Sequence, residues 1–176
     1  MAHHLIPVES DWPILIRESV TIAAPRDKVW DVFTDFTAYP EWNPHWRSCT
    51  LLDAKKNPLL AGTPIATGHH LQLKIHLPPT LEDSVPTRTI TELLSDVSLG
   101  SYISWGARRM PFLFRTSRLY LLTDVELEGG GQGTKMEAFS AVGGVLGALF
   151  PARMQWDLRM GIKEMNEALK TRCEQT

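Results

Sequence analysis

"IAAPRDKVWDVFTDFTAYPEWNP" occupies residues 22–44 and marks the point at which a strand gives way to helices. Pro25 suits the first turn of a helix, and Asp27 suits the positive end of the helix dipole. Apolar residues then follow at helical spacing, at Val29, Val32 and Phe33. The pattern predicts a short amphipathic helix within residues 24–35.

The second half of this stretch continues into "AYPEWNPHW", residues 38–46. Pro40 and Pro44 exclude a regular helix or a central strand, so a second, broken helical turn is expected. We expect Trp42 to close the core beneath this turn, because an indole buries a large apolar area. Trp46, on the strand that leaves the turn, is expected to line one end of a cavity.

Strands are predicted on both sides of these helices. The clearest is "HLQLKIHL" (70–77), in which leucine and isoleucine alternate with polar residues, as expected of an antiparallel strand with one wet face. That alternation turns His70 and His76 toward water. The other predicted strands cover residues 14–22, 45–53, 87–94, 100–107, 114–127 and 134–142.

The last predicted element is a long helix over about residues 150–173, opened by Pro151. Its apolar stripe comprises Met154, Leu158, Gly161, Ile162, Met165 and Leu169. Such a stripe is expected to be buried against the concave face of the sheet, with space between helix and sheet. We therefore expect an α+β fold with an N-terminal arm (1–13) and a single domain (14–176).

Composition excludes several classes of function. With 43% hydrophobic and 22% charged residues, the chain is ordinary globular material. A net charge of −2, without a basic stretch that carries interleaved aromatics, argues against nucleic-acid binding. The longest apolar run, residues 141–150, is too short to span a bilayer. Cys49 and Cys173 fit no metal or redox spacing, so a cytoplasmic location is expected.

The chain resembles the SRPBCC superfamily, the START-like helix-grip proteins, which include polyketide cyclase/dehydratase-like members. The similarity rests on A-P, V-W and Y-P-x-W-N within residues 22–44, and on E-x-F at the start of residues 137–150. It also includes "GIKEMNEALKTRCE" (161–174), "LPPT" and "ITEL". The resemblance implies a curved antiparallel sheet of about seven strands around the C-terminal helix, with two short helices after the first strand. It also implies a cavity for a lipid, sterol or polyketide.

One departure from the family affects any catalytic reading. Relatives often carry Gly-x-His in the strand before the Gly-rich turn, where this chain has "RTSRLYL" with Arg118 at the expected histidine. An arginine cannot act as a base near neutral pH, although it can hold an anion or an enolate.

The hairpin across "EGGGQG" (128–133) suggests candidate catalytic residues. A turn near residues 128–131 places Tyr120 opposite Glu137 on the neighbouring strand, and Arg118 then lies diagonal to Glu137. On a concave face, the three side chains could deliver a proton and stabilise an oxyanion. On the solvent face, Arg118 and Glu137 would form only a cross-strand ion pair.

His45 is the fourth candidate, either as a general base at a cavity mouth or as a surface histidine beside a buried indole. No metal or other cofactor is expected, because the histidines lack a third ligand at a recognisable spacing. The expected cavity wall comprises Trp46, Leu71, Leu73, Ile75, Tyr102, Phe139, Met154, Leu158 and Met165.

Three functions remain open on the sequence alone. The first is binding of an apolar small molecule, polyketide- or lipid-like, in an internal cavity. The second is metal-independent cyclase, dehydratase or isomerase chemistry on a polyketide-like substrate, with Glu137 or His45 as base, Tyr120 as proton donor and Arg118 as oxyanion holder. The third is a protein-partner domain, which no charged or aromatic surface stripe favours. The oligomeric state stays open.

Overall fold

The computed structural model describes residues 5–175, except for the side chains of Arg108 and Arg109. Seven strands form one antiparallel sheet in the order β1-β7-β6-β5-β4-β3-β2. Their bounds are β1 (Ile14–Ile22), β2 (Trp46–Leu52), β3 (His70–Ile75), β4 (Arg88–Ser98), β5 (Tyr102–Arg109), β6 (Phe114–Glu126) and β7 (Gln132–Gly143). The helices are η2 (Glu9–Asp11), α1 (Arg26–Thr34), α2 (Tyr39–Trp42), α3 (Val145–Ala148) and α4 (Ala152–Glu174).

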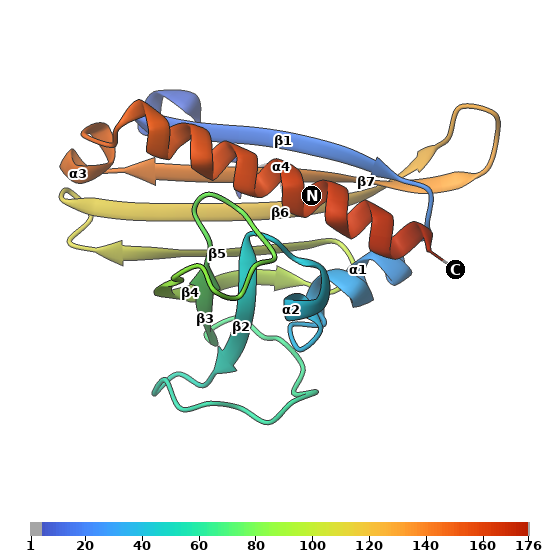
Figure 1. The fold of residues 1–176 in the computed structure, drawn as a ribbon, viewed down its shortest axis with the longest axis horizontal. Coiled ribbons are helices and arrows are strands. Elements are labelled where there is room, and N and C mark those ends of the chain that lie inside the picture. The colour runs from blue at the N-terminus through green and yellow to red at the C-terminus, as the bar shows by residue number, and fades with distance from the viewer. Residues whose placement is uncertain (1–4, 176) are drawn as a thin grey trace.

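The predicted helix-grip fold is confirmed. Consecutive strands β1 and β2 form opposite edges of the sheet, and α1 and α2 connect them. The long helix α4 runs along one face of the sheet beside β1 and β7, with α1 and α2 at its C-terminal end (Figure 1). We call the face that packs against α1, α2 and α4 the inner face.

The core lies between the inner face and the helices. Residues of β1 and β7 alternate into it because strand side chains point to opposite faces of a sheet. The helix α4 packs chiefly on β1, and its buried residues follow the predicted stripe. These are Leu158, Gly161, Ile162, Met165, Asn166, Leu169 and Cys173. Each fully buried leucine or isoleucine there contributes about 1.5–3 kcal/mol.

The hairpin register differs from the prediction by one residue. Tyr120 pairs with Ala138, and Glu137 pairs with Leu121. The reason is the turn, which places five residues (127–131) between the last pair, Glu126 and Gln132. Its three glycines adopt positive φ, between 92° and 100°, which accommodates that odd-numbered loop.

A shift of one residue turns every side chain of a strand to the other face. The expected convergence of Glu137 with Tyr120 and Arg118 is therefore wrong. Glu137 lies on the outer face, where its carboxylate is 3.2 Å from the ammonium of Lys135. Phe139 and Tyr102 also lie on the outer face by strand parity, so they do not face the core.

The outer face carries its own small apolar layer. Leu119 pairs with Phe139, and both are buried although they lie outside the main core cluster. The guanidinium carbon of Arg17 lies 4.8 Å from the centre of the Phe139 ring. Phe139 is thus covered by a cation–π contact rather than by a helix.

The N-terminal arm is held at its end. The Arg115 guanidinium donates a hydrogen bond of 2.5 Å to the Asp11 carbonyl and lies 4.5 Å above the Trp12 ring. These contacts fix the segment that enters β1. Residues 1–4 of the expected arm, like Thr176, lie outside the described residues.

Candidate functional site

A pocket lies at the side of the sheet, between α1, β2 and the loop that follows β2. Its volume is about 660 Å³, and it is partly open to solvent. The apolar lining comprises Trp30, Phe36, Cys49, Leu51, Leu59, Leu60, Ala61, Pro64, Ile65 and Leu99. We call it the side pocket.

Local turn chemistry places the loop over the side pocket. The carboxylate of Asp53 accepts backbone hydrogen bonds of 2.8 Å from both Lys55 and Asn57. The hydrogen bonds from Asn57, with that from Lys55, lower the pKa of Asp53. Leu59 N–H then donates to the Leu51 carbonyl at 2.9 Å, which pins the loop back onto β2. Leu59 and its neighbours are thereby held against the pocket.

The rim of the side pocket exposes apolar surface. Leu60 and Leu99 line the pocket and are 86% and 69% exposed. Leucines this exposed at a concave site indicate a surface that a ligand could cover. The polar part of the rim carries two aspartates and four threonines: Asp31, Asp35, Thr34, Thr37, Thr50 and Thr63.

None of the nine predicted cavity-wall residues lines the side pocket. Six of them lie in the packed core: Trp46, Leu71, Leu73, Ile75, Leu158 and Met165. Met154 is partly buried against that core, and Tyr102 and Phe139 lie on the outer face, where the Tyr102 hydroxyl donates to Asp96 at 3.2 Å. In the middle of the sheet, large side chains thus occupy the space in which a cavity was expected.

Aromatic rings fill that central space. Trp46, Trp105 and Tyr120 have ring centres 5.1 to 5.6 Å apart, and the ring of Phe33 from α1 lies 5.0 Å from that of Tyr120. The Tyr120 hydroxyl and both indole nitrogens are buried and have no hydrogen-bond partner among the described residues. Burial raises the pKa of Tyr120 well above its usual value, so the phenol stays protonated.

A buried ion pair lies beside these rings. Arg118 and Glu92 are 6% and 2% exposed, and the Arg118 guanidinium donates to both oxygens of the Glu92 carboxylate. The Thr116 hydroxyl donates to the same carboxylate at 2.7 Å, and it accepts from the backbone N–H of Ala107 at 2.9 Å. Glu92 therefore neutralises the cation that the sequence suggested for an oxyanion.

Sequence reasoning missed Glu92, although the signal was present. In "TRTITELL" (87–94), Glu92 has the same parity as Ile90 and Leu94 and so shares their face. A charged residue on the apolar parity of a strand needs a partner, because a buried unpaired charge is costly.

His45 is buried, in contrast to the expectation of a surface histidine. Its Nδ1 lies 3.3 Å from the His76 carbonyl, and its backbone N–H donates to the Asn43 side chain at 3.0 Å. Burial, reinforced by the nearby Arg118 cation, lowers the pKa of His45 to about 3. On α4, a Cβ added at Gly161 would overlap the His45 ring, so only glycine lets the helix approach this closely.

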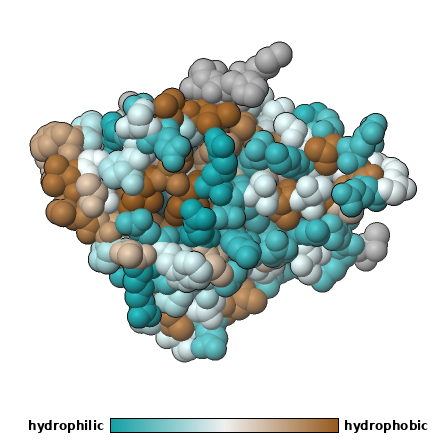
Figure 2. Space-filling model, turned by 90° about the horizontal axis from the view of Figure 1, so that it is seen from above, coloured by the Kyte–Doolittle hydropathy of each residue, from teal (hydrophilic) through white to brown (hydrophobic). Residues whose placement is uncertain are grey.

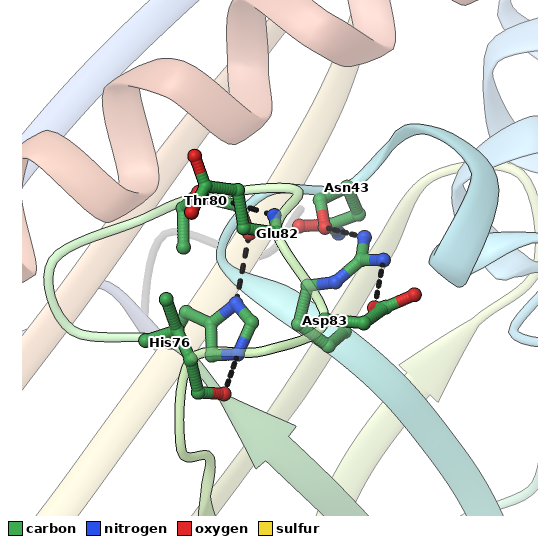
Figure 3. Close-up of polar contacts among 7 residues, drawn as sticks. Asn43, His76, Thr80, Glu82 and Asp83 are labelled. Carbon is green, nitrogen blue, oxygen red and sulfur yellow. Dashed lines mark hydrogen bonds and ion pairs between the residues drawn. The ribbon is translucent and has the colours of Figure 1, made fainter.

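His76 is also buried, whereas the alternation predicted it in water. The strand ends at Ile75, so parity no longer applies to the next residue. The ring turns into the loop that follows, with Nδ1 2.8 Å from the Thr80 carbonyl and Nε2 2.8 Å from that of Val85 (Figure 3). Because carbonyl oxygens only accept, both contacts are hydrogen bonds only when both ring nitrogens carry hydrogen.

An ion pair fixes the same loop to β2. The Arg47 guanidinium donates to Asp83 at 2.8 Å and to the Asn43 carbonyl at 3.1 Å. The hydrogen bond and charge of Arg47 lower the pKa of Asp83. Figure 3 shows the contacts of His76 and Arg47, which together hold the loop of residues 76–87 against residues 43–47.

Two negative findings apply to residues 5–175 with described side chains. They contain no group of three or more histidine, cysteine, aspartate or glutamate side chains placed to hold a metal ion. No helix in this part of the chain is long and apolar enough to cross a membrane.

Solved structures of similar fold come from several organisms. A START superfamily protein from Mycobacterium smegmatis is 17% identical, with a TM-score of 0.61 over 92% of this chain and 97% of that one. The Zhui aromatase/cyclase from Streptomyces sp. R1128 is 17% identical, with a TM-score of 0.59 over 92% and 93%. A protein from Chromobacterium violaceum is 14% identical, with a TM-score of 0.63 over 93% and 99%.

Identities this low show the shared fold alone. No curated protein sequence matches the chain. Residues 13–174, nearly the whole chain, match the family described as polyketide cyclase / dehydrase and lipid transport. The chain therefore belongs to that family.

Proposed function

We propose that the protein binds an apolar small molecule, lipid- or polyketide-like, in the side pocket. The observation that carries the proposal is a pocket of about 660 Å³ whose rim exposes Leu60 and Leu99. This volume lies within the range of about 300–1,000 Å³ that is usual for small-molecule sites. Family membership supports a hydrophobic ligand.

The rim also restricts the polar end of the ligand. Asp31 and Asp35 are exposed carboxylates of the pocket lining, and the hydroxyls of Thr34 and Thr63 already donate to backbone carbonyls at 2.8 and 2.7 Å. Those groups are left as acceptors. We therefore expect an apolar body with a hydroxyl or amine donor rather than a free carboxylate.

A neutral fluorescent apolar probe such as Nile red tests the site together with a neutral long-chain alcohol as competitor. Leu60→Asp combined with Leu99→Asp should weaken alcohol binding at least tenfold, because covering one leucine is worth about 1.5–3 kcal/mol. Leu81→Asp is the matched control, since Leu81 is also exposed but does not line the side pocket. Equal affinities in the rim and control variants would refute the proposal.

The second candidate is acid–base catalysis of the cyclase or dehydratase kind, and one observation favours it. The unpaired Tyr120 hydroxyl is a buried proton donor on the inner face. The pKa of His45, about 3, leaves that imidazole neutral but makes it a weak base, and Arg118 lies near enough to perturb both residues. Glu137 is not part of this set, because it lies on the outer face.

Cyclisation of a synthetic β-polyketone thioester, followed by absorbance of the aromatic product, tests this candidate. Tyr120→Phe should abolish turnover, and Tyr102→Phe, on the outer face, should not. If no aromatic product forms with the unmodified protein, or if both variants turn over equally, the binding function stands alone.

We further propose a cytoplasmic location, supported by two free, buried thiols, Cys49 and Cys173.

A further inference from the structure

One end of the molecule exposes a cluster of large apolar side chains. They lie on the turn between β5 and β6 and on α3 with the residue that follows it, and Figure 2 shows apolar surface at this end. Phe112 and Leu149 are 73% and 71% exposed. The full set, which we call the apolar tip, comprises Met110, Phe112, Val145, Leu146 and Leu149.

The apolar tip is a built structure and not a frayed end. Val145 N–H donates to the Phe112 carbonyl at 3.0 Å, and Leu146 N–H donates to that of Leu113 at 3.0 Å. Gly144, at a φ of 81°, permits this approach, because a Cβ there would lie 2.6 Å from the Leu113 carbonyl oxygen. Backbone groups of the tip are thus paired internally while its apolar side chains point outward, as insertion into an apolar phase requires.

Charge is distributed unevenly along the sequence, although Asp157 and Glu18 lie 3.9 and 3.6 Å from Arg153 and Arg159. No acidic residue occurs between Asp96 and Asp124, or between Glu137 and Asp157. Segments 107–115 and 144–160 contain five basic residues and one acidic residue, a net charge of +4. The remaining sequence has 13 basic and 19 acidic residues, a net charge of −6.

We propose that the apolar tip docks the protein onto a membrane surface that contains anionic lipids. Apolar side chains would enter the boundary between headgroups and acyl chains, and the basic surroundings would be attracted to the lipid charge. Arg153 is one such cation: its side chain is 86% exposed, and its only described ion-pair contact, with the Asp157 carboxylate, is long at 3.9 Å. Trp156, exposed on the second turn of α4, has the amphipathic indole typical of membrane interfaces.

This proposal does not depend on the side pocket. Leu99, at the pocket rim, precedes β5, and the apolar tip follows it, so the two surfaces lie at opposite ends of that strand (Figure 1). A docked protein therefore keeps its pocket rim away from the bilayer. Docking would concentrate the protein at a membrane without requiring the side pocket to bind lipid.

Co-sedimentation with vesicles tests the proposal. The full chain should bind vesicles of phosphatidylcholine mixed with phosphatidylserine at least tenfold more tightly than vesicles of phosphatidylcholine alone, and binding should weaken as salt increases. Phe112→Ser combined with Leu149→Ser should reduce binding at least tenfold. Leu81→Ser combined with Leu93→Ser is the matched control, because both leucines are exposed elsewhere. Equal urea midpoints would show that all variants fold.

Two further variants separate the possible causes. Arg153→Glu should weaken binding to anionic vesicles more than Arg88→Glu, an exposed arginine at the start of β4. The rim variant Leu60→Asp with Leu99→Asp should bind vesicles normally, since only the side pocket is altered. Failure of the full chain to bind anionic vesicles would overturn the proposal. A second result would also overturn it: the full chain self-associates in ultracentrifugation, the Phe112/Leu149 variant does not, and neither binds vesicles. The apolar tip would then join two copies of the chain.

Discussion

Removing one partner of the Arg118–Glu92 pair should destabilise the protein far more than removing both. Both side chains are almost fully buried, so a single replacement leaves a charge without its partner in the core. The usual cost of this change is about 3–5 kcal/mol, whereas replacement of both partners by apolar residues is often neutral. The Thr116 hydroxyl would lose its acceptor in the double variant, which adds about 1 kcal/mol.

The two single variants should differ in their pH dependence. After Glu92→Leu, the guanidinium cannot release its proton, so the full cost persists at every pH. After Arg118→Met, the carboxyl can instead take up a proton. For a free glutamic acid, with a pKa of about 4.3, this costs about 3.7 kcal/mol at pH 7 and about 1.4 kcal/mol less per pH unit below it. Arg118→Met should therefore recover stability toward pH 5, relative to the unmodified protein, and Glu92→Leu should not.

Urea unfolding followed by tryptophan fluorescence measures these differences. With an m-value of about 2 kcal/mol per M, a loss of about 4 kcal/mol lowers the midpoint by about 2 M. The double variant Glu92→Leu with Arg118→Met should lie within about 0.5 M of the unmodified protein. The reasoning is refuted if each single change costs less than about 1 kcal/mol, or if the two costs simply add in the double variant.

Three further outcomes are expected. Burial lowers the pKa of His45 from 6.5 to about 3, so between pH 3 and pH 6.5 the unfolded chain binds a proton that the folded chain does not. The free energy of unfolding should therefore be greatest above pH 6.5 and fall by up to about 1.4 kcal/mol per pH unit as pH decreases through this range. In urea unfolding measured at a series of pH values, His45→Gln should flatten that decrease. Gly161→Ala should destabilise α4 packing by about 1–3 kcal/mol in calorimetry instead of gaining about 1 kcal/mol of helix propensity, and a His45→Ala background should remove most of that cost. His76→Ala should make the loop of residues 76–87 sensitive to limited proteolysis, whereas His70→Ala, within β3, should not; equal cleavage of the two variants would contradict the role of the paired carbonyls.

The sequence was sufficient for the fold because its strongest signals are local. Period-two alternation in residues 70–77 and the helix start at Pro25 each specify an element without reference to distant residues. The packing of about seven antiparallel strands around the C-terminal helix then followed from the resemblance to a known family. The structure confirms this level of the prediction.

The candidate site was less predictable because it depends on one-residue details. A five-residue glycine turn placed Glu137 on the outer face, although its sequence suggested a shorter connection. Strand parity could not describe His76, which lies one residue beyond β3. The side pocket was out of reach for another reason: its wall includes residues 59–65, an irregular loop whose path depends on tertiary contacts such as Leu59 with Leu51.

The pairing of β1 with β7 has a consequence for synthesis of the chain. Ile14 pairs with Val142, so the first strand must wait for more than a hundred residues before its only strand partner leaves the ribosome. At about 5–20 residues per second, that wait lasts roughly 6–25 seconds. The apolar side of β1 remains without α4 for even longer, because that helix comes last. A nascent chain of this topology therefore has a prolonged need for chaperones, and ribosome stalling within β7 or α4 should be a major source of its aggregation.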